Sequence, residues 1–407
     1  MDRDQAQRLD AESPLAFARE RFRLPGNLIY LDGNSLGALP SAVPARMRKV
    51  VESEWGTGLI GSWNEAHWME LGARVAGRLG ALVGADGADI HVGDSTSVSL
   101  FKTMVAATRM RPDRRALVVE QSTFPTDGYV AAGVADLLGL ELRWCDPADP
   151  VAAVDDDVAM LSLTQVDFRT GARFDMAAIT AAAQDRGALV QWDLCHSVGA
   201  MPVDLTGSGA DFAVGCTYKY LNGGPGSPAF LWVAPRHQAG LRPPITGWMG
   251  HAEPFAMTRE WAPRDGAASM ASGTPPVLAL SALEAALSVF DDLDLADVRR
   301  ASLSLTDLFI DLVDDRVGDA VRIVTPRDHA RRGSQVSLAH PDAYGIAAAL
   351  VDRGVVGDFR VPDIARFGFA PLYVRHVDVY DAVGHLVAVL DKGEHRDRAY
   401  ASRNAVT

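Results

Sequence analysis

A lysine stands between two tyrosines in the stretch GCTYKYLNGGPGSP, residues 215–228, at the end of an apolar run. The chain has only four lysines against 35 arginines, so this is one of the few positions that arginine does not fill. A buried lysine amine can lose its proton and then act as a nucleophile or form a Schiff base, whereas a guanidinium stays protonated. Lys219 is therefore a candidate for covalent catalysis.

Other polar and aromatic side chains stand where a predicted strand ends or a predicted helix begins. In open α/β sheets ligands bind at the carboxyl ends of the strands, so these side chains are expected to meet at one edge. The cofactor pyridoxal 5′-phosphate needs a lysine for a Schiff base, a carboxylate at its pyridine nitrogen, an aromatic face for its ring and a helix N-terminus for its phosphate. The residues that can take these roles, in this order, are Lys219, Asp193, Phe124 and the group Ser95, Thr96 and Ser97.

Each of these residues also has a simpler interpretation when it is taken singly. A carboxylate at a strand end often caps a turn, and the DSTS stretch is an ordinary signal for a helix N-cap. Phe124 or His196 alone is more typical of a protein core, and a lone lysine is usually on the surface. Lys102, inside an apolar helical stretch, is interpreted as a side chain that extends along its helix to water. The functional interpretation therefore depends on the combination of residue types in this order.

The elements that must position these residues follow a regular alternation. Short β-rich runs alternate with Ala/Leu segments at helical spacing, which predicts βαβ units and an α/β fold with a mostly parallel central sheet and helices on both faces. The predicted strands are 115–120, 158–163, 188–193, 211–216 and 227–233. The predicted helices are 96–108, 127–138, 175–186 and 279–292.

Near residue 290 the alternation of β-rich and helical segments changes, which predicts that the chain is divided into three parts. An N-terminal segment, 1–40, joins the small domain; a large cofactor-binding domain spans 41–290; and a small C-terminal α+β domain spans 291–407, with a solvated or frayed tail from residue 391. A long helix around 279–315 is expected to bridge the two domains. Residues 242–276, rich in proline and glycine, are expected to form a long functional loop.

Composition limits the classes of binding partner and the cellular location that we expect. The net charge of −13 and the pI near 5.2 argue against nucleic acid or an anionic membrane as a partner, so a small-molecule substrate is expected. The three cysteines form no CxxC pair and lie in no metal-like cluster, which predicts neither a disulfide frame nor a metal site. No apolar signal segment and no stretch of about 20 apolar residues is present, so a cytoplasmic protein is expected.

Nine motifs in this chain order resemble the kynureninase family, which belongs to the fold-type I pyridoxal-phosphate enzymes of aminotransferase class V. The resemblance runs from about residue 15 to about residue 392. DxxH followed by YK is shared across class V, whereas FPTDGY, YKYLNGGPGSP and RFGFAPLY together are much closer to kynureninase. The motifs are YLDGNSLG (30–37), WNEAHW (63–68), GDSTSVSLFK (93–102), FPTDGY (124–129), WDLCHSVGAMPVDL (192–205), DFAVGCTYKYLNGGPGSPAF (211–230), GWMGH (247–251), SGTPP (272–276) and RFGFAPLY (366–373).

The resemblance implies a role for each matching residue. Lys219 would form the Schiff base and later move protons, Asp193 would pair with the pyridine nitrogen, and Tyr218 would act as acid or base with a pKa lowered by Lys219. Arg366 would bind the substrate carboxylate through its bidentate fork. The implied cofactor-binding residues are Thr96, Ser97, Phe124, Pro125, Thr126, Asp127, Asp193, His196, Tyr218, Lys219 and, from the other subunit of a homodimer, Trp248 and Thr274. The implied substrate-binding residues are Arg366, Trp63, Asn34 and Gly273.

The activity that the resemblance implies is hydrolysis of L-kynurenine to anthranilate and L-alanine, in catabolism of tryptophan. Trp63, Gly273 and Thr274 resemble bacterial members that prefer kynurenine over its 3-hydroxy form. Hydrolysis of another ring-substituted kynurenine and a class V aminotransferase are the enzymatic alternatives, and a cofactor-binding regulator without turnover is the alternative from another class. A cysteine desulfurase is not expected, because it needs a mobile cysteine well after the lysine and the last cysteine here is Cys216.

Overall fold

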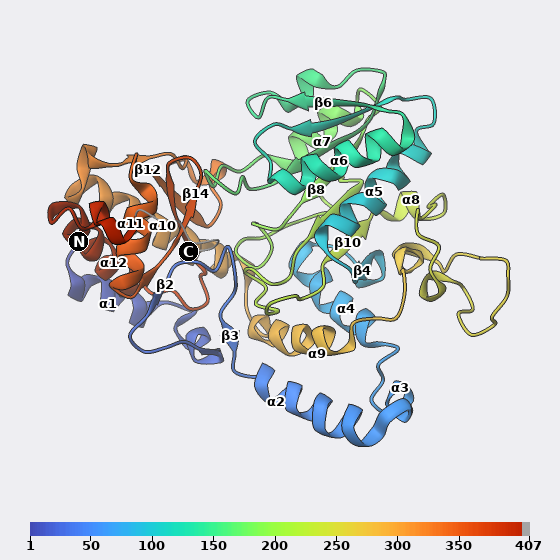
Figure 1. Ribbon diagram of the computed structural model, residues 1–407, viewed down its shortest axis with the longest axis horizontal. Coiled ribbons are helices and arrows are strands. Elements are labelled where there is room, and N and C mark those ends of the chain that lie inside the picture. Colours follow the sequence, from blue (N-terminus) through green and yellow to red (C-terminus); the bar gives the residue numbers. More distant parts are fainter. Residues whose placement is uncertain (401–407) are drawn as a thin grey trace.

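The computed structural model describes residues 1–400, in which two larger β-sheets lie side by side and are covered by helices (Figure 1). The larger sheet has the strand order β4, β10, β9, β8, β7, β5, β6. Its neighbouring strands are parallel except at β10, which is antiparallel to both β9 and β4. The strands are β4 (Ile90–Val92), β5 (Ala116–Glu120), β6 (Glu141–Cys145), β7 (Val158–Thr164), β8 (Leu189–Asp193), β9 (Phe212–Gly215) and β10 (Phe230–Val233).

Helices cover both faces of this sheet, so its central strands are buried along their whole length and consist mainly of apolar residues. The side chains of Ser95 and Asp175 cap α5 and α7 by accepting hydrogen bonds from backbone N–H groups. Gly84 and Gly139 end α4 and α6 in the left-handed conformation that glycine adopts without strain. The helices are α4 (Leu71–Val83), α5 (Thr96–Met110), α6 (Pro125–Leu138), α7 (Met176–Gln184), α8 (Pro235–Gln238) and α9 (Val277–Ala286).

The predicted strands and helices of this part are confirmed, but the prediction misses β4 and β6. β4 has only three residues, and β6 is an edge strand whose residues are mostly half-buried or exposed. Neither segment therefore shows the apolar run by which a buried strand is found in a sequence.

The smaller sheet is antiparallel, with the order β11, β12, β15, β14. Its strands are β11 (Arg322–Ile323), β12 (Gln335–Ala339), β14 (Asp358–Arg360) and β15 (Ile364–Gly368). The helices beside it are α10 (Leu295–Arg316), α11 (Ala343–Asp352) and α12 (His376–Asp391). Apolar side chains of α10, α11 and α12 pack with those of the sheet in one core.

The N-terminal segment lies against this smaller sheet (Figure 1). β2 pairs in parallel with β13, and the Asp10 carboxylate accepts hydrogen bonds from the backbone N–H groups of His376 and Val377 where α12 begins. The exact limits of the three predicted parts stay a prediction. The remaining elements are α1 (Arg3–Glu12), β1 (Phe22–Arg23), β2 (Ile29–Tyr30), β3 (Leu39–Pro40), α2 (Val43–Arg48), α3 (Ser62–Glu65) and β13 (Val355–Val356).

One expectation about a connection is wrong. The bridging helix is interrupted, because α9 ends at Ala286 and α10 begins only at Leu295, after Asp292 has taken a positive φ and Asp294 has capped the new helix. The chain end is anchored as far as Tyr400, whose hydroxyl donates to Asp352. Residues 391–400 are mostly exposed, so the expectation of a solvated or frayed tail stays a prediction, and 401–407 lie outside the described residues.

Residues 242–276 form the expected long connection, with only two short helical turns, Trp248–Gly250 and Gly266–Met270. Among residues 1–400 no helix is both long and apolar enough to cross a membrane.

Candidate functional site

A cavity of about 220 Å³ lies where the carboxyl ends of β7 and β8 meet the loop that follows β9. Its walls come from the larger sheet, from the smaller sheet and from the N-terminal segment. Most of the residues predicted for the site line this cavity, namely Asn34, Thr96, Ser97, Phe124, Thr126, Asp127, Asp193, His196, Tyr218, Lys219 and Arg366. The strand-end rule predicted that Asp193, His196, Lys219, Phe124 and Thr96 would meet, and these residues do line one cavity; their roles stay a prediction.

The other predicted site residues do not line this cavity. Pro125 is the first residue of α6, and Trp63, in α3, packs against Trp68 with the ring centroids 5.5 Å apart. Gly273 and Thr274 line a separate cavity of about 380 Å³, and Trp248 is 40% exposed. Pro125 nevertheless lies between two residues that line the cavity, Phe124 and Thr126, whereas Trp63, Trp248, Gly273 and Thr274 line no part of it.

Lys219 is held by a tight turn and by the N-terminal segment. Its carbonyl oxygen accepts a hydrogen bond of 2.8 Å from the backbone N–H of Asn222, which has a φ of 59°. The backbone N–H of Gly37 donates to the carbonyl oxygen of Tyr218 over 2.8 Å. The Lys219 amine, Nζ, lies 2.9 Å from Nε2 of His196. The position of the amine is thus fixed by two segments that are far apart in the sequence.

His196 is a neutral neighbour of this amine. Burial lowers the pKa of its imidazole well below the ordinary value, and the charge of Lys219 lowers it further. The imidazole therefore carries no charge at neutral pH. Its Nδ1 is buried and has no hydrogen-bond partner among residues 1–400, so the ring has an unused polar atom beside the cavity.

Two buried carboxylates, Asp193 and Asp127, face the same region. Burial raises the pKa of Asp193, and burial together with the nearby charge of Asp193 raises the pKa of Asp127 well above its ordinary value. Asp193 Oδ1 accepts a hydrogen bond of 2.7 Å from the backbone N–H of Cys195. Because a buried carboxylate with a raised pKa is stabilised by a nearby cation, this pair favours a ligand that presents a positively charged N–H group.

The N-terminus of α5 offers a place for an anion. Ser95 caps the helix, its hydroxyl oxygen accepting from the N–H of Val98 over 3.4 Å, and Thr96 and Ser97 form the first turn, whose N–H groups have no partner within the helix. Lys102 holds the preceding loop, because its amine donates over 2.5 Å to both Asp94 and the carbonyl oxygen of Met270. Lys102 is fully buried, so the interpretation that its side chain extends along the helix to water is wrong.

Tyr218 differs from the expectation in its protonation. Burial raises the pKa of its phenol far above the ordinary value, and the neighbouring thiols raise it further. Lys219 Nζ lies 5.9 Å from the centroid of the Tyr218 ring, over its aromatic face. The expected lowering of this pKa by Lys219 is therefore wrong, and Tyr218 is a protonated donor at neutral pH.

Arg366 lines the cavity, and four of its five N–H groups already donate within the protein. Its Nε donates to Asp358 Oδ1 over 2.8 Å, its Nη2 donates to Asp358 Oδ2, and its Nη1 donates to the carbonyl oxygen of Phe168 over 2.6 Å. The side chain is 1% exposed. Nη1 keeps one further N–H, so the expected binding of a substrate carboxylate by Arg366 stays a prediction.

Sequence reasoning missed other lining residues, among them Ser35, Thr164, Phe168 and Arg360. Thr164 is the last residue of β7, so the strand-end rule could have found it; its hydroxyl lies 2.6 Å from that of Thr123. Phe168 packs edge-on against Phe124 with the centroids 5.2 Å apart. It lies in a connecting loop, where no periodic pattern distinguishes it from other aromatic residues.

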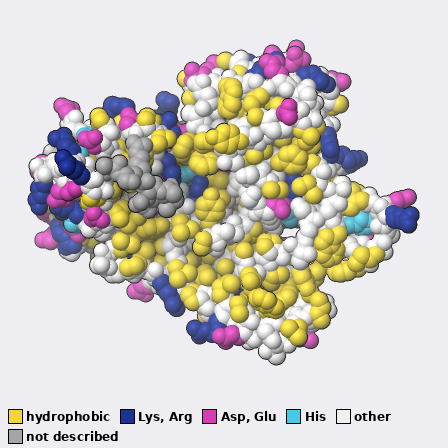
Figure 2. Space-filling view, viewed as in Figure 1, with side chains coloured by type: hydrophobic (Ala, Val, Ile, Leu, Met, Phe, Trp, Pro, Cys, Tyr) yellow, Lys and Arg dark blue, Asp and Glu magenta, His cyan; other side chains and the backbone are white. Residues whose placement is uncertain are grey.

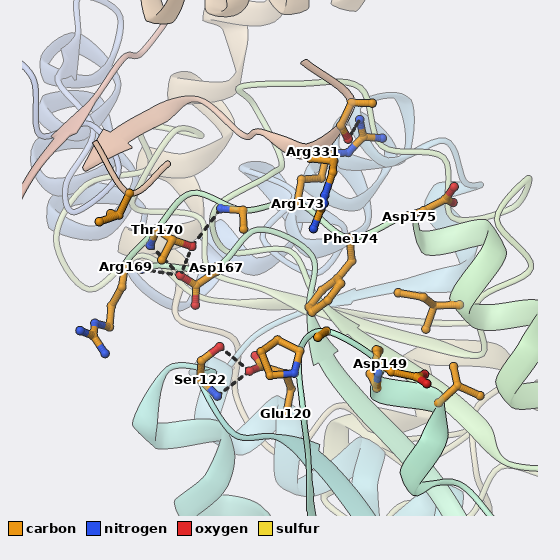
Figure 3. Close-up of a pocket in the computed structure, with 18 of the residues that line it drawn as sticks. Glu120, Ser122, Asp149, Asp167, Arg169, Thr170, Arg173, Phe174, Asp175 and Arg331 are labelled. Atoms are coloured by element: carbon orange, nitrogen blue, oxygen red, sulfur yellow. Dashed lines mark hydrogen bonds between the residues drawn. The ribbon is translucent and has the colours of Figure 1, made fainter. Parts of the chain in front are cut away.

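A larger groove of about 1200 Å³ adjoins the site (Figure 3). Phe168 lines the cavity, whereas its neighbours Asp167 and Arg169 line the groove. Asp167 Oδ1 accepts hydrogen bonds from the hydroxyl and the N–H of Thr170, both over 2.6 Å. This short turn thus separates the two hollows.

Comparison with known proteins agrees with this geometry. The family model described as the kynureninase C-terminal domain matches residues 298–386. The kynureninase of Deinococcus radiodurans is 53% identical, covering 97% of this chain and 98% of that protein, and the kynureninase of Pseudomonas fluorescens is 49% identical, covering 98% of both.

Solved structures show the same fold at low identity. A cysteine desulfurase of Thermococcus onnurineus has a TM-score of 0.79 and 18% identity, covering 94% of this chain and 99% of that chain. A cysteine desulfurase of Escherichia coli has a TM-score of 0.77 and 19% identity, covering 93% and 98%. With relatives of about half identity along almost its whole length, this chain belongs to the kynureninase family.

Proposed function

We propose that this chain hydrolyses L-kynurenine to anthranilate and L-alanine, with pyridoxal 5′-phosphate as its cofactor. The observation that carries the proposal is the single cavity that collects Lys219, Asp193, the N-terminus of α5 and Arg366. These are an amine, a buried acid, an anion site and a cation, which are the groups that an amino acid and this cofactor require together. Full-length relatives named kynureninase support the choice of substrate.

The residues of the cavity fit the cofactor. The Lys219 amine can bond to its aldehyde, and Asp193 can pair with its protonated ring nitrogen, which would relieve the raised pKa of that carboxyl. Phe124 is 44% exposed and borders the cavity, so it has a free face for the ring. Thr96 and Ser97 would hold the phosphate at the start of α5. The unpartnered Nδ1 of His196 is a further polar atom for a ligand.

Lys219, His196 and Tyr218 each have a separate role in the proposed reaction. Bound pyridoxal phosphate supplies an aldehyde for the substrate's amino group and a ring that withdraws electrons from the neighbouring carbons. Lys219 takes the proton from the substrate's Cα, and the neutral His196 beside it accepts a hydrogen bond from the amine. Tyr218, a protonated phenol, donates to the oxygen of the γ-carbonyl while water attacks the carbon, which prepares the bond between Cβ and Cγ for cleavage.

Two measurements on one sample, cofactor absorbance and anthranilate fluorescence, test this proposal. We expect a visible absorbance band when pyridoxal phosphate is added to the purified protein, loss of that band in Lys219→Ala, and growth of anthranilate fluorescence after addition of L-kynurenine. Arg322→Gln, on the exposed edge of the smaller sheet, is the control for a charge change outside the cavity. A band without anthranilate would contradict the substrate assignment and would favour a substituted kynurenine or amino transfer.

Desulfuration of cysteine is not supported by the structure, in spite of the shared fold. Cys145, Cys195 and Cys216 are all buried, and a desulfurase needs a cysteine that can reach its substrate. The same three free thiols fit a reducing compartment, so we place the protein in the cytoplasm.

The proposal includes a homodimer whose active sites are shared between subunits. Hydrophobic side chains gather over the lower part of the molecule in Figure 2, where Figure 1 places α2 and α9. In the segment that follows α2, Trp55, Leu59 and Ile60 are 55%, 61% and 81% exposed. Apolar surface of this extent is typical of an interface. Trp248 and Thr274, which lie away from Lys219 of their own chain, would complete the site of the second subunit.

A mixing experiment tests the shared site. Lys219→Ala and Trp248→Ala are each expected to be nearly inactive, but a heterodimer of the two carries one site with both residues intact. Refolding an equimolar mixture should therefore restore about a quarter of the wild-type activity, since half of the dimers are mixed and each has one good site. Activity no higher than the sum of the two variants would contradict sharing, and a single-subunit mass in sedimentation would contradict the dimer.

A further inference from the structure

Two histidines and an aspartate gather beside the smaller sheet, away from the site cavity. His340 follows β12 directly, Asp342 is the residue before α11, and His395 lies in a short helical turn, Glu394–Arg396, after α12. One nitrogen of each imidazole and one carboxylate oxygen of Asp342 lie within 4.8 Å of one another. None of the three residues is among those that line the cavity around Lys219. They therefore form a separate cluster of groups that can bind a metal ion.

His395 presents a buried lone pair to this cluster. Its Nδ1 lies 3.3 Å from the carbonyl oxygen of Val389, so Nδ1 is the nitrogen that donates and Nε2 carries the lone pair. The side chain is 2% exposed, and Nε2 has no hydrogen-bond partner among residues 1–400. A buried acceptor without a partner costs free energy, which a ligand at Nε2 would recover. A histidine that binds a metal commonly donates its other N–H to a carbonyl oxygen in this way.

Close packing and an ion pair fix the turn that carries His395. A Cβ atom at Gly345, in α11, would collide with the carbonyl oxygen of His395, so the helix and the turn approach this closely only because the residue is glycine. On the other side, Arg353 donates to both carboxylate oxygens of Glu394, over 2.7 and 2.6 Å. The His395 imidazole is thus held in place before any ion binds, which reduces the entropic cost of binding.

Asp342 and His340 supply the second and third ligand atoms. The Asp342 carboxylate does not cap α11, and its Oδ2 lies 3.9 Å from Nε2 of His395 and 3.7 Å from Nε of the exposed Arg396. Two ligand atoms of a tetrahedral zinc ion are about 3.4 Å apart, so the half-exposed carboxylate needs to move by only about 0.5 Å. Nδ1 of His340 accepts a hydrogen bond of 2.9 Å from the N–H of Asp342, and binding must break this bond. His340 is therefore the weakest of the three ligands.

We propose that His395, Asp342 and His340 form a structural site for Zn²⁺. Imidazole and carboxylate together suit this ion, whereas Mg²⁺ and Ca²⁺ prefer oxygen ligands alone. The ion fastens the turn after α12 to the start of α11 and so stabilises this end of the chain. Sequence reasoning did not expect a metal site, because the two histidines are far apart in the chain and no close spacing marks them. The inference does not depend on the proposed function.

Zinc chloride alone is the probe for this site. The holoenzyme, treated with EDTA and freed of unbound pyridoxal phosphate, is titrated with Zn²⁺ in a calorimeter, and thermal unfolding is followed with and without the ion. The wild type should bind one ion per chain at this site, and the unfolding midpoint should rise because the ion binds the folded arrangement. His395→Asn should weaken binding by about 10-fold or more and remove the rise. His329→Asn is the matched control, because His329 is exposed and contacts Asp307 outside the cluster.

Asp342→Asn keeps the test decisive if His395→Asn does not fold. The Asp342 side chain is 48% exposed and caps no helix, so this variant should fold and should also bind Zn²⁺ about 10-fold or more weakly. His340→Asn should have a smaller effect than either substitution. Absence of saturable binding to the wild type would overturn the inference. Equal affinity in the wild type, His395→Asn and Asp342→Asn would also overturn it, since the ion would then bind elsewhere.

Discussion

Replacing Gly37 by alanine should disturb the catalytic lysine from outside the cavity. A Cβ atom at this position would lie 2.3 Å from the carbonyl oxygen of Lys219, 2.5 Å from Oδ1 of Asn222 and 2.7 Å from Cα of Asn222. Two of these three atoms belong to the backbone of the turn that carries Lys219, so no side-chain rotation relieves the contact. Ordinary contacts begin at 3.4 Å, and the turn must therefore move by about 1 Å in a densely packed region.

The displacement should affect turnover more than folding. Overpacking of this kind costs about 1–3 kcal/mol, which leaves the protein folded if its free energy of unfolding is ordinary, about 5–15 kcal/mol. A shift of about 1 Å in a catalytic group can cost about 100-fold in rate. We therefore expect kcat/KM for L-kynurenine to fall by about two orders of magnitude, with cofactor absorbance retained.

Anthranilate fluorescence and urea unfolding measure the two effects separately. Gly26→Ala is the matched control, because it is in the same N-terminal segment and a Cβ there meets nothing within 4 Å. Its activity and stability should stay close to those of the wild type. A folded Gly37→Ala protein with wild-type kcat/KM would refute the reasoning, because it would show that the turn can move without displacing the Lys219 amine.

Three further substitutions test the titratable side chains Asp193, Tyr218 and Asp32. Asp193→Asn removes the carboxylate expected at the cofactor's ring nitrogen; kcat should fall by about 100-fold or more, the effect of losing one preorganised electrostatic partner, and an unchanged kcat with cofactor bound would contradict that role. Tyr218→Phe should lower kcat by about 100-fold while cofactor absorbance persists, because the phenol is a protonated donor; a wild-type rate would exclude it as an acid. Asp32, whose pKa rises from 3.8 to about 7 on folding, binds a proton more tightly in the folded state, so its contribution lowers the free energy of unfolding as pH rises from about 4 to about 7. Asp32→Asn should remove that part of the slope, measured by urea unfolding at pH 5 and pH 8, and an identical slope in both proteins would show that Asp32 does not titrate this way.

Much of the candidate site was predictable because it depends on local chemistry. Asp193 and Thr164 end buried strands, and Thr96 begins a helix with a strong N-cap signal. Such positions are marked in the sequence by an apolar run and a polar residue that ends it. The topology of a parallel sheet then brings these ends to one edge without further information.

The residues that sequence reasoning placed wrongly depend on long-range packing. Lys102 was expected to extend along its helix to water, but it is buried and holds the loop before α5 by donating to Asp94 and to the carbonyl oxygen of Met270. The sequence contains no signal for this contact, because Met270 is far along the chain. The interruption between α9 and α10 was also hidden, since both sides of it have helical periodicity.

By itself the sequence indicated some of the groups in the candidate site: one of only four lysines, a strand-end aspartate and a capped helix. Only the tertiary structure decided their state. Burial raises the pKa of Tyr218 still further above neutral, and the pairing of β14 with β15 places Asp358 against the guanidinium of Arg366 and leaves the Arg360 side chain 33% exposed. Both outcomes arise from the same physical cause, because desolvation and partner choice are set by which distant segments pack together, and residue type alone does not specify them.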